Sequence, residues 1–248
     1  MKLISGMHRS GSSLVARLFA AAGADMGDPH TFYRPDQWNP EGYFEQPDIH
    51  AINFPLINGP FGRLSYLHLP SEATILSRAE NLADAISDAA KKYDHKVVKE
   101  NRFSLTFRAW QLYGGNFERV LICLRDPIQV AMSLKKRNWI PLSHGFYLWR
   151  EHNNRLITSL LNIPYQFVYY ADLLNPETAQ ASMKSMFDFM EVDVPSHKLE
   201  QLAKEHIKIN MNNNPVVDYP YPPHIQELWI RLMGEYRAQK AQAAAYAG

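Results

Sequence analysis

The alternation of apolar and polar positions at the amino terminus predicts a strand, a glycine loop and a helix in succession. Residues 2 to 5 form a short apolar run that stops at Gly6. From residue 10 onward, apolar side chains recur at helical spacing, at Leu14, Val15, Leu18 and Phe19. A short run of apolar residues is typical of a buried strand, and apolar residues that recur about every 3.6 positions are typical of an amphipathic helix. Here the first pattern leads directly into the second.

The same patterns recur along the rest of the chain. They predict strands over Lys96–Lys99, Glu118–Leu124 and Tyr165–Tyr170, and helices over Glu72–Tyr93, Pro127–Leu134, 146–161, Glu177–Glu191 and about Ile225–Lys240. Strands that alternate with helices are typical of a parallel sheet covered on both faces. The sequence therefore predicts one α/β domain over residues 1–240. The alanine-rich residues 241–248 are predicted to be a flexible tail.

Between Asp28 and Pro60 the pattern changes, because six prolines are scattered among aromatic residues. Proline removes a backbone donor and restricts the residue before it, so long regular elements are not expected there. We predict an ordered segment that covers the sheet. Trp110 and Trp149 lie at helical positions and are expected in the core.

Composition and charge narrow the classes of function. The chain has 248 residues, of which 46% are hydrophobic and 21% charged, as expected of a folded domain. With 26 Lys and Arg against 25 Asp and Glu, the net charge of +1 provides no global field for nucleic acid or an anionic membrane. The stretch from Lys96 to Arg137 nevertheless carries nine basic residues and three acidic ones, which indicates a local anion site.

The cysteine content and the amino terminus exclude further classes. Cys123, the single cysteine, lies in an apolar run, which excludes an internal disulfide framework and favours a buried thiol. No cluster with metal-ligand spacing is present, so no metal is expected. His8 and Arg9 interrupt the first apolar residues too early for a signal peptide or membrane span, and we expect a cytoplasmic protein.

The first chemical motif is the loop from Gly6 to Gly11, which has the Gly-x-x-x-x-Gly frame of a phosphate loop. Its position between a strand and a helix directs backbone N–H groups and the helix dipole at an anion. A nucleoside triphosphate loop has lysine after the second glycine, where this chain has Ser12. Arg9 supplies a cation from within the loop instead.

The second motif follows the strand at Glu118–Leu124. Arg125 stands at the strand end, where a guanidinium can form paired hydrogen bonds with a phosphate. Pro127 suits the first turn of the helix that follows. Ser133 lies about two helical turns along that helix, and Arg137 lies beyond it.

These segments resemble the sulfotransferases that use 3′-phosphoadenosine-5′-phosphosulfate (PAPS). The loop at 7–13 is similar to their 5′-phosphosulfate loop, and Arg125-Asp-Pro with Ser133 is similar to their 3′-phosphate site. Further similar segments occur in the order found in the bacterial carbohydrate-type family: Asn39–Glu45, Lys99–Arg102, Leu148-Trp149 and Tyr170–Leu174. Where that family has Lys-Asp-Pro-Arg, this chain has Lys-Glu-Asn-Arg, and the resemblance spans about residues 2 to 191.

The resemblance implies a P-loop-like fold and a role for each motif. The residues expected at the 5′-phosphosulfate are Arg9, Ser10, Gly11, Ser12 and Ser13. Those expected at the 3′-phosphate are Arg125 and Ser133, with Arg137 as a further candidate. Sulfuryl transfer depends on positioning and on stabilising spread negative charge, so it needs no metal in principle.

Transfer to a hydroxyl requires a group that accepts its proton. Glu45 is the leading candidate, because flanking aromatic residues are expected to desolvate it and raise its pKa. An even alternative is that Glu45 caps a helix beginning near Asp48. His8 is the second candidate for the base, and Lys99, at a strand end, is expected to stabilise the leaving oxygen.

Together these features predict a soluble sulfotransferase that moves a sulfuryl group from PAPS to a hydroxyl of a sugar or other small metabolite. Two alternatives remain open. A nucleotide-dependent kinase is disfavoured by the missing loop lysine, whereas a non-catalytic adenine-nucleotide-binding module would keep Arg9 and Arg125. The segments expected to shape the acceptor pocket are 28–62 and 205–223.

Overall fold

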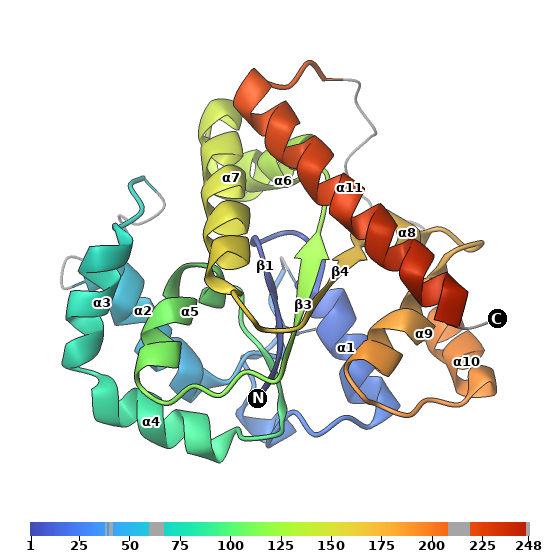
Figure 1. The fold of residues 1–248 in the computed structure, drawn as a ribbon, viewed down its shortest axis with the longest axis horizontal. Coiled ribbons are helices and arrows are strands. Elements are labelled where there is room, and N and C mark those ends of the chain that lie inside the picture. Colours follow the sequence, from blue (N-terminus) through green and yellow to red (C-terminus); the bar gives the residue numbers. More distant parts are fainter. Residues whose placement is uncertain (38, 40–41, 60–66, 208–218, 247–248) are drawn as a thin grey trace.

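The computed structural model describes residues 1–37, 39, 42–59, 67–207 and 219–246, which form one sheet with helices on both faces (Figure 1). Within these residues the sheet has four strands, β1 Lys2–Gly6, β2 Val97–Lys99, β3 Arg119–Leu124 and β4 Tyr165–Tyr169. Their order is β2-β1-β3-β4, and every neighbouring pair is parallel. The predicted α/β class with a parallel sheet is confirmed.

The helices follow and connect these strands. In chain order they are α1 Ser12–Ala22, the short 3₁₀ helix η1 Pro29–Thr31, α2 Pro47–Asn58, α3 Glu72–Glu80, α4 Ala83–Lys92, α5 Phe103–Leu112, α6 Pro127–Asn138, α7 Leu142–Ser159, α8 Tyr170–Leu174, α9 Ala179–Phe189, α10 Ser196–His206 and α11 Pro223–Tyr246. The predicted strands and the helices after residues 10 and 127 are confirmed, with ends that differ by a few residues.

Alternate residues of the strands face two separate cores. One contains Leu3, Val98, Val120, Ile122, Leu124 and Phe167 with residues of α2 to α7 and α11. The other contains Ile4, Val97, Leu121, Cys123 and Val168 with residues of α1, α8, α9 and α10. Trp110 and Trp149 are fully buried in the first core, as predicted. Burial raises the pKa of the Cys123 thiol to about 12, which agrees with an inert core cysteine.

The prediction that 28–60 lacks long regular elements is wrong for its second half, where α2 forms. Pro47 stands in the first turn, where the missing N–H has no helical partner in any case. Pro55 lies inside the helix and is tolerated because the burial of Ile49, Ile52 and Leu56 against the first core stabilises this segment. Tertiary packing here outweighs the local cost of proline.

Two other helix boundaries differ from the predictions. The single helix expected over Glu72–Tyr93 is divided, since α3 ends at Glu80 and α4 begins at Ala83. The break allows Ile75 and Ile86 both to reach the first core. The flexible tail predicted from residue 241 is helical as far as Tyr246, in keeping with the high helix propensity of alanine.

The outer edge of β4 is closed by α11. The Gln239 side-chain amide accepts a hydrogen bond from the Phe167 N–H at 2.9 Å and donates one to the Tyr165 carbonyl at 3.2 Å. A side chain thus pairs with backbone groups that an edge strand would leave open to another chain. Among the described residues, no helix combines the length and apolarity needed to cross a membrane.

Candidate active site

The site lies where the connections of two neighbouring strands leave for opposite faces of the sheet. Gly6 at the end of β1 is in register with Cys123 near the end of β3. β1 continues into α1 in the second core, whereas β3 continues into α6 in the first. Open parallel sheets bind ligands at such a switch point, beyond the carboxyl ends of the strands.

The glycines of the loop after β1 are required by close packing. A Cβ on Gly6 would stand 2.6 Å from the Cys123 carbonyl oxygen, and one on Gly11 would overlap the Tyr170 ring. Both glycines also have positive φ, of 138° and 92°. Arg9 has a φ of 72°, which is unusual for a residue with a side chain. The predicted phosphate-loop frame is therefore a tight turn that its neighbours hold in place.

The loop presents polar groups at the start of α1. Gly11 is the N-cap residue, and in the part of the chain that the structure describes no side chain caps this helix. The first turn of a helix has N–H groups without intrahelical partners and carries the positive end of the dipole. The Ser10 hydroxyl is buried and has no hydrogen-bond partner among the described residues. Unpartnered buried polar groups are uncommon, and these donors suit an anion.

The structure brings the second motif to this loop. Arg9 Nε donates to Ser133 Oγ at 2.9 Å, and Arg125 Nη1 donates to the Arg9 carbonyl at 3.0 Å. Arg125 also donates from Nε to Gln129 Oε1 at 3.1 Å and stacks 4.5 Å above the Tyr170 ring. Residues more than a hundred positions apart thus form one cationic cluster.

The environment of Arg125 is unusual for a cation. Its side chain is buried, and burial lowers the pKa of the guanidinium, with a further decrease from the charge of Arg9. Trp149 Nε1 donates to the Arg125 carbonyl at 3.1 Å, and Asp126 caps α6 by accepting from the Ile128 N–H at 3.0 Å. An anion at this position would offset the cost of holding two guanidinium groups together.

Arg137, the third predicted cation, lies near the end of α6. It donates to the Tyr43 hydroxyl at 3.3 Å, and Tyr43 donates to Asp36 at 2.7 Å. These contacts connect α6 to the segment Asn39–Glu45, through Tyr43. Pro40 and Glu41 of that segment lie outside the described residues, as do 60–62 and 208–218 of the predicted pocket-shaping segments.

A buried cluster of charges stands beside the loop. Lys99 Nζ contacts Glu45 Oε1 at 2.5 Å, Arg102 contacts Glu45 Oε2 at 3.5 Å, and Arg102 also contacts Glu100 Oε1 at 2.9 Å. Glu45, Lys99 and Glu100 are all buried. The predicted candidates Glu45 and Lys99 are therefore ion-paired to each other.

The expected rise in the pKa of Glu45 is wrong. Burial does favour the protonated form, but the charges of Lys99 and Arg102 outweigh it and lower the pKa of the carboxyl. Burial instead raises the pKa of Glu100. The helix-capping alternative for Glu45 is not what the structure has, since Gln46 is the N-cap residue of α2 and Glu45 points to Lys99.

A cavity of about 540 Å³ adjoins this cluster. Its polar lining consists of His8, His50, Asn58, Arg102, Arg137, Asn138 and His152, and its apolar lining of Phe54, Ile57, Leu67, Leu69, Leu105, Ile140 and Leu148. Burial lowers the pKa of His8 well below its usual value, that of His50 to about 4 and that of His152 to about 3. All three imidazoles are neutral at pH 7.

Sequence patterns missed His50, His152 and Glu100 as members of this site. His152 Nδ1 shares a 2.6 Å hydrogen bond with Ser104 Oγ, and its ring meets that of His8 edge to face at 5.5 Å. For Glu100 the one sequence signal is its place in Lys-Glu-Asn-Arg, where the similar sulfotransferase motif, Lys-Asp-Pro-Arg, has another residue. For His50 the one sequence signal is its closeness to Glu45 along the chain. No helical or strand periodicity adds to that signal.

Two carboxylates and an imidazole also converge here, which the sequence did not predict. One ligand atom from each of Glu45, His50 and Glu100 lies within 4.8 Å of the others. Lys99 and Arg102 already supply positive partners to both carboxylates. A second, more exposed group of Asp94, His95 and Glu118 lies elsewhere.

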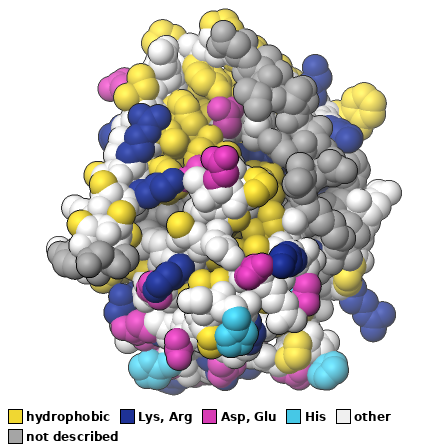
Figure 2. All heavy atoms as spheres, turned by 90° about the vertical axis from the view of Figure 1, so that its right-hand side faces the viewer, with side chains coloured by type: hydrophobic (Ala, Val, Ile, Leu, Met, Phe, Trp, Pro, Cys, Tyr) yellow, Lys and Arg dark blue, Asp and Glu magenta, His cyan; other side chains and the backbone are white. Residues whose placement is uncertain are grey.

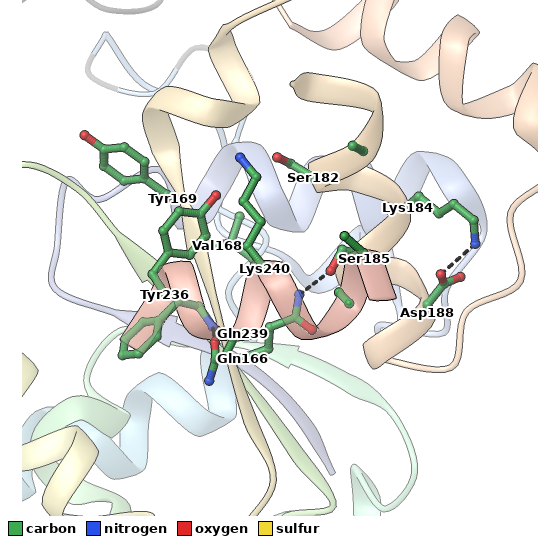
Figure 3. Close-up of a pocket in the computed structure, with 14 residues that line it drawn as sticks. Gln166, Val168, Tyr169, Ser182, Lys184, Ser185, Asp188, Tyr236, Gln239 and Lys240 are labelled. Carbon is green, nitrogen blue, oxygen red and sulfur yellow. Dashed lines mark hydrogen bonds and ion pairs between the residues drawn. The ribbon is translucent and has the colours of Figure 1, made fainter. Parts of the chain in front are cut away.

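Another cavity, of about 230 Å³, lies between β4, α9 and α11 (Figure 3). Gln166 donates to Ser185 at 2.9 Å within it, and the exposed Lys184–Asp188 ion pair, at 2.6 Å, also lines it. Figure 2 shows this side of the molecule, on which hydrophobic side chains gather between charged ones. None of the predicted site residues lines this cavity.

Comparisons with known proteins address the fold. No family model matches the sequence, and no curated protein matches it. Among solved structures, the sulfotransferase domain of the olefin synthase from Synechococcus PCC 7002 has a TM-score of 0.58, with 14% identity over 94% of each chain. The sulfotransferase domain from the curacin biosynthetic pathway has a TM-score of 0.55, with 14% identity over 94% of this chain and 97% of that one. The fold of this chain is therefore the fold of sulfotransferase domains, as its motifs predicted.

Proposed function

We propose that the protein is a sulfotransferase that moves a sulfuryl group from PAPS to a hydroxyl of a sugar or other small metabolite. The observation that carries the proposal is the cationic cluster of Arg9, Arg125 and Ser133 against a glycine loop whose Ser10 hydroxyl is buried without a partner among the described residues. This cluster occupies the switch point of a fold found in sulfotransferase domains.

The loop residues suit the 5′ end of the donor. Backbone N–H groups of Ser12 and Ser13 lie in the first turn of α1, next to Gly11, and would bind the phosphosulfate together with the Ser10 hydroxyl. Arg9 would balance its charge. When bound, PAPS supplies the sulfuryl group and leaves as 3′-phosphoadenosine 5′-phosphate, the bisphosphate.

The residues after β3 suit the 3′ end. Arg125 provides a planar set of donors, and Ser133 already accepts from Arg9, so a phosphate here would contact both motifs. Arg137 stands on the same helix and also lines the larger cavity, which we assign to the acceptor. The acceptor hydroxyl then lies between the histidines and the donor loop.

Glu45, His8 and Lys99 remain the candidate catalytic residues from the sequence. Lys99 would stabilise charge that develops on the leaving oxygen, because it is the buried cation at the end of β2. Glu45 is ionised by its pairing with Lys99, and His8 is neutral, so each is in the state that accepts a proton.

Thermal unfolding with ligands tests the proposal. The bisphosphate at about 100 times its dissociation constant stabilises a protein by about 2.7 kcal/mol, so it should raise the Tm without magnesium. Arg9→Ala should abolish the shift, whereas Arg108→Ala, on the exposed face of α5, should preserve it. Stabilisation by ATP with magnesium and none by the bisphosphate would instead indicate a kinase.

Transfer itself is measured with PAPS carrying a radiolabelled sulfuryl group and a panel of hydroxyl acceptors. Label in an acceptor, lost in Arg9→Ala, supports the sulfotransferase assignment. A Tm shift with the bisphosphate but no transfer to any sugar, alkyl alcohol or phenol would indicate that the protein is a non-catalytic nucleotide-binding module.

A further inference from the structure

His50 connects the buried charge cluster to the cavity. It lies on α2, its ring forms part of the cavity wall, and its Nδ1 atom is buried without a hydrogen-bond partner among the described residues. Glu100 Oε2 is likewise buried and unpartnered within that part of the chain. A ring nitrogen of His50 and a carboxylate oxygen of each of Glu45 and Glu100 lie within 4.8 Å of one another.

We propose that His50 is the general base of the reaction, with Glu45 and Glu100 as the residues that position its ring. This assignment rests on the proposed sulfotransferase function and replaces Glu45 as the group that takes the proton. In the reacting complex we place the acceptor at His50 Nε2, and the ring turns its Nδ1–H, which forms no hydrogen bond among the described residues, toward the two nearby carboxylates. A carboxylate in this position selects one imidazole tautomer and stabilises the imidazolium that forms.

The other two histidines of the cavity have different surroundings among the described residues. His152 Nδ1 is occupied by Ser104 Oγ at 2.6 Å. The charged groups that act on His8 are Arg102, Lys99 and Arg137, and those that act on His152 are Arg155 and Arg102, all of which oppose a positive ring. His50 also faces Arg102, but Glu45 opposes that effect. The charge of Glu45 therefore favours protonation of His50.

The charges around the cluster favour a proton over a metal ion as its positive occupant. Lys99 and Arg102 already contact Glu45, and Arg102 contacts Glu100. A divalent cation would stand beside two fixed positive groups, whereas a proton on His50 adds a single charge opposite two carboxylates.

Proton transfer to His50 accompanies the exchange of bonds at sulfur. The O–H bond of the acceptor breaks, and its proton moves to Nε2 of the neutral His50 ring. The acceptor oxygen forms a bond to sulfur while the bond from sulfur to the 5′-phosphate oxygen breaks, and that electron pair leaves with the bisphosphate. His50 becomes an imidazolium held by Glu45 and Glu100, and later releases its proton to water.

Substitutions at His50 test the assignment under single-turnover conditions. His50→Phe retains a ring against Tyr33 and Phe54, which lie 5.0 and 5.7 Å from the present ring, and removes both nitrogens. It should lower the transfer rate by about 10² to 10⁴-fold and leave the affinity for the bisphosphate unchanged. In His50→Ala, added imidazole should raise the transfer rate at least tenfold. His197→Ala, on the exposed surface of α10, is the control.

Two outcomes overturn different conclusions. If wild-type protein transfers sulfuryl groups and His50→Phe does so within threefold of it, His50 is not the base, although the proposed function stands. If the wild-type protein transfers to no acceptor, the proposed function itself fails.

Nitrogen NMR of the wild-type ring provides a measurement that needs no acceptor. A neutral His50 with its proton on Nδ1 at pH 7, and a shift toward the other tautomer in Glu100→Gln, supports the assignment. A proton resident on Nε2, or a ring unaffected by Glu100→Gln, overturns it.

Discussion

Arg125 has two roles in the structure, which its sequence motif alone does not separate. It fixes the loop by donating to the Arg9 carbonyl, and it adds positive charge where the 3′-phosphate is proposed to lie. Arg125→Ala should weaken binding of the bisphosphate by about 10- to 100-fold, because hydrogen bonds to charged groups contribute about 1.5 to 3 kcal/mol. Calorimetry with the bisphosphate and with AMP separates the tasks. An equal loss for both ligands would mean that Arg125 only supports the loop.

The Glu45–Lys99 pair makes a second prediction. Glu45→Gln leaves the Lys99 ammonium buried without its closest carboxylate, and removing one partner of a buried pair costs about 3 to 5 kcal/mol. The free energy of unfolding in urea should fall accordingly, and less steeply in the double variant with Lys99→Met. Glu200→Gln, at an exposed pair with Lys204, should leave stability unchanged. A Glu45→Gln protein as stable as wild type would show that the pair contributes nothing.

The same pair fixes the direction of a pH effect. The pKa of folded Glu45 lies below its ordinary value of 4.5, so its contribution to stability is complete above that value. It is lost as the pH falls through the folded pKa. Stability of wild type should therefore decrease more than that of Glu45→Gln when both are titrated below pH 4.5.

Sequence reasoning at this scale predicted the local arrangement where it is contiguous. Gly6, Arg9 and Gly11 stand in one short loop, so its tight turn could be predicted from spacing. Glu45 and Lys99 are 54 positions apart, and only the fold shows that a lysine rather than aromatic rings decides the pKa of that carboxyl. His50 could not be identified from its position in the sequence, because Glu45 and Glu100 approach it from two different connections.

At the scale of elements, the start of α1 depends on Gly11. Gly11→Ala would place a Cβ in the Tyr170 ring, at a φ of 92°. Gly23, at the end of the same helix, has a φ of 93°, and a methyl group added there would meet nothing within 4 Å, so Gly23→Ala measures the backbone strain alone. That strain is worth about 1–2 kcal/mol. Gly11→Ala should lose more stability than Gly23→Ala in urea and should also lose bisphosphate binding. Equal effects of the two variants would show that the Tyr170 contact yields without cost.

Elements with strong periodicity were predicted, and those decided by tertiary packing were not. β1, β3 and α6 show clear apolar patterns bounded by glycine or proline, which act locally. α2 forms despite two prolines, because it buries isoleucine and leucine side chains in the first core. α5 was not predicted, since its apolar residues surround it almost completely and seven of its ten residues are buried.

At the scale of the molecule, the fold class followed from strand and helix alternation, which is a global property of the pattern. The site, in contrast, depends on where segments that pack on opposite faces of the sheet meet. The donor loop leads into α1, which packs in the core shared with α8, α9 and α10, whereas Arg125 precedes α6 and Ser133 lies on it, and α6 packs in the other core. A ligand that contacts both motifs therefore connects the two faces of the sheet.

This connection predicts which segments of the protein are protected from hydrogen exchange when the ligand binds. The bisphosphate should slow amide hydrogen exchange in residues 7–16 and in 126–134 together, because opening either segment would break contacts to the same molecule. α9 and the end of α11, which surround the smaller cavity, should change little. Arg9→Ala should remove the protection of both segments at once. Protection confined to one segment, with the other exchanging as in the free protein, would show that the two motifs do not bind a single nucleotide.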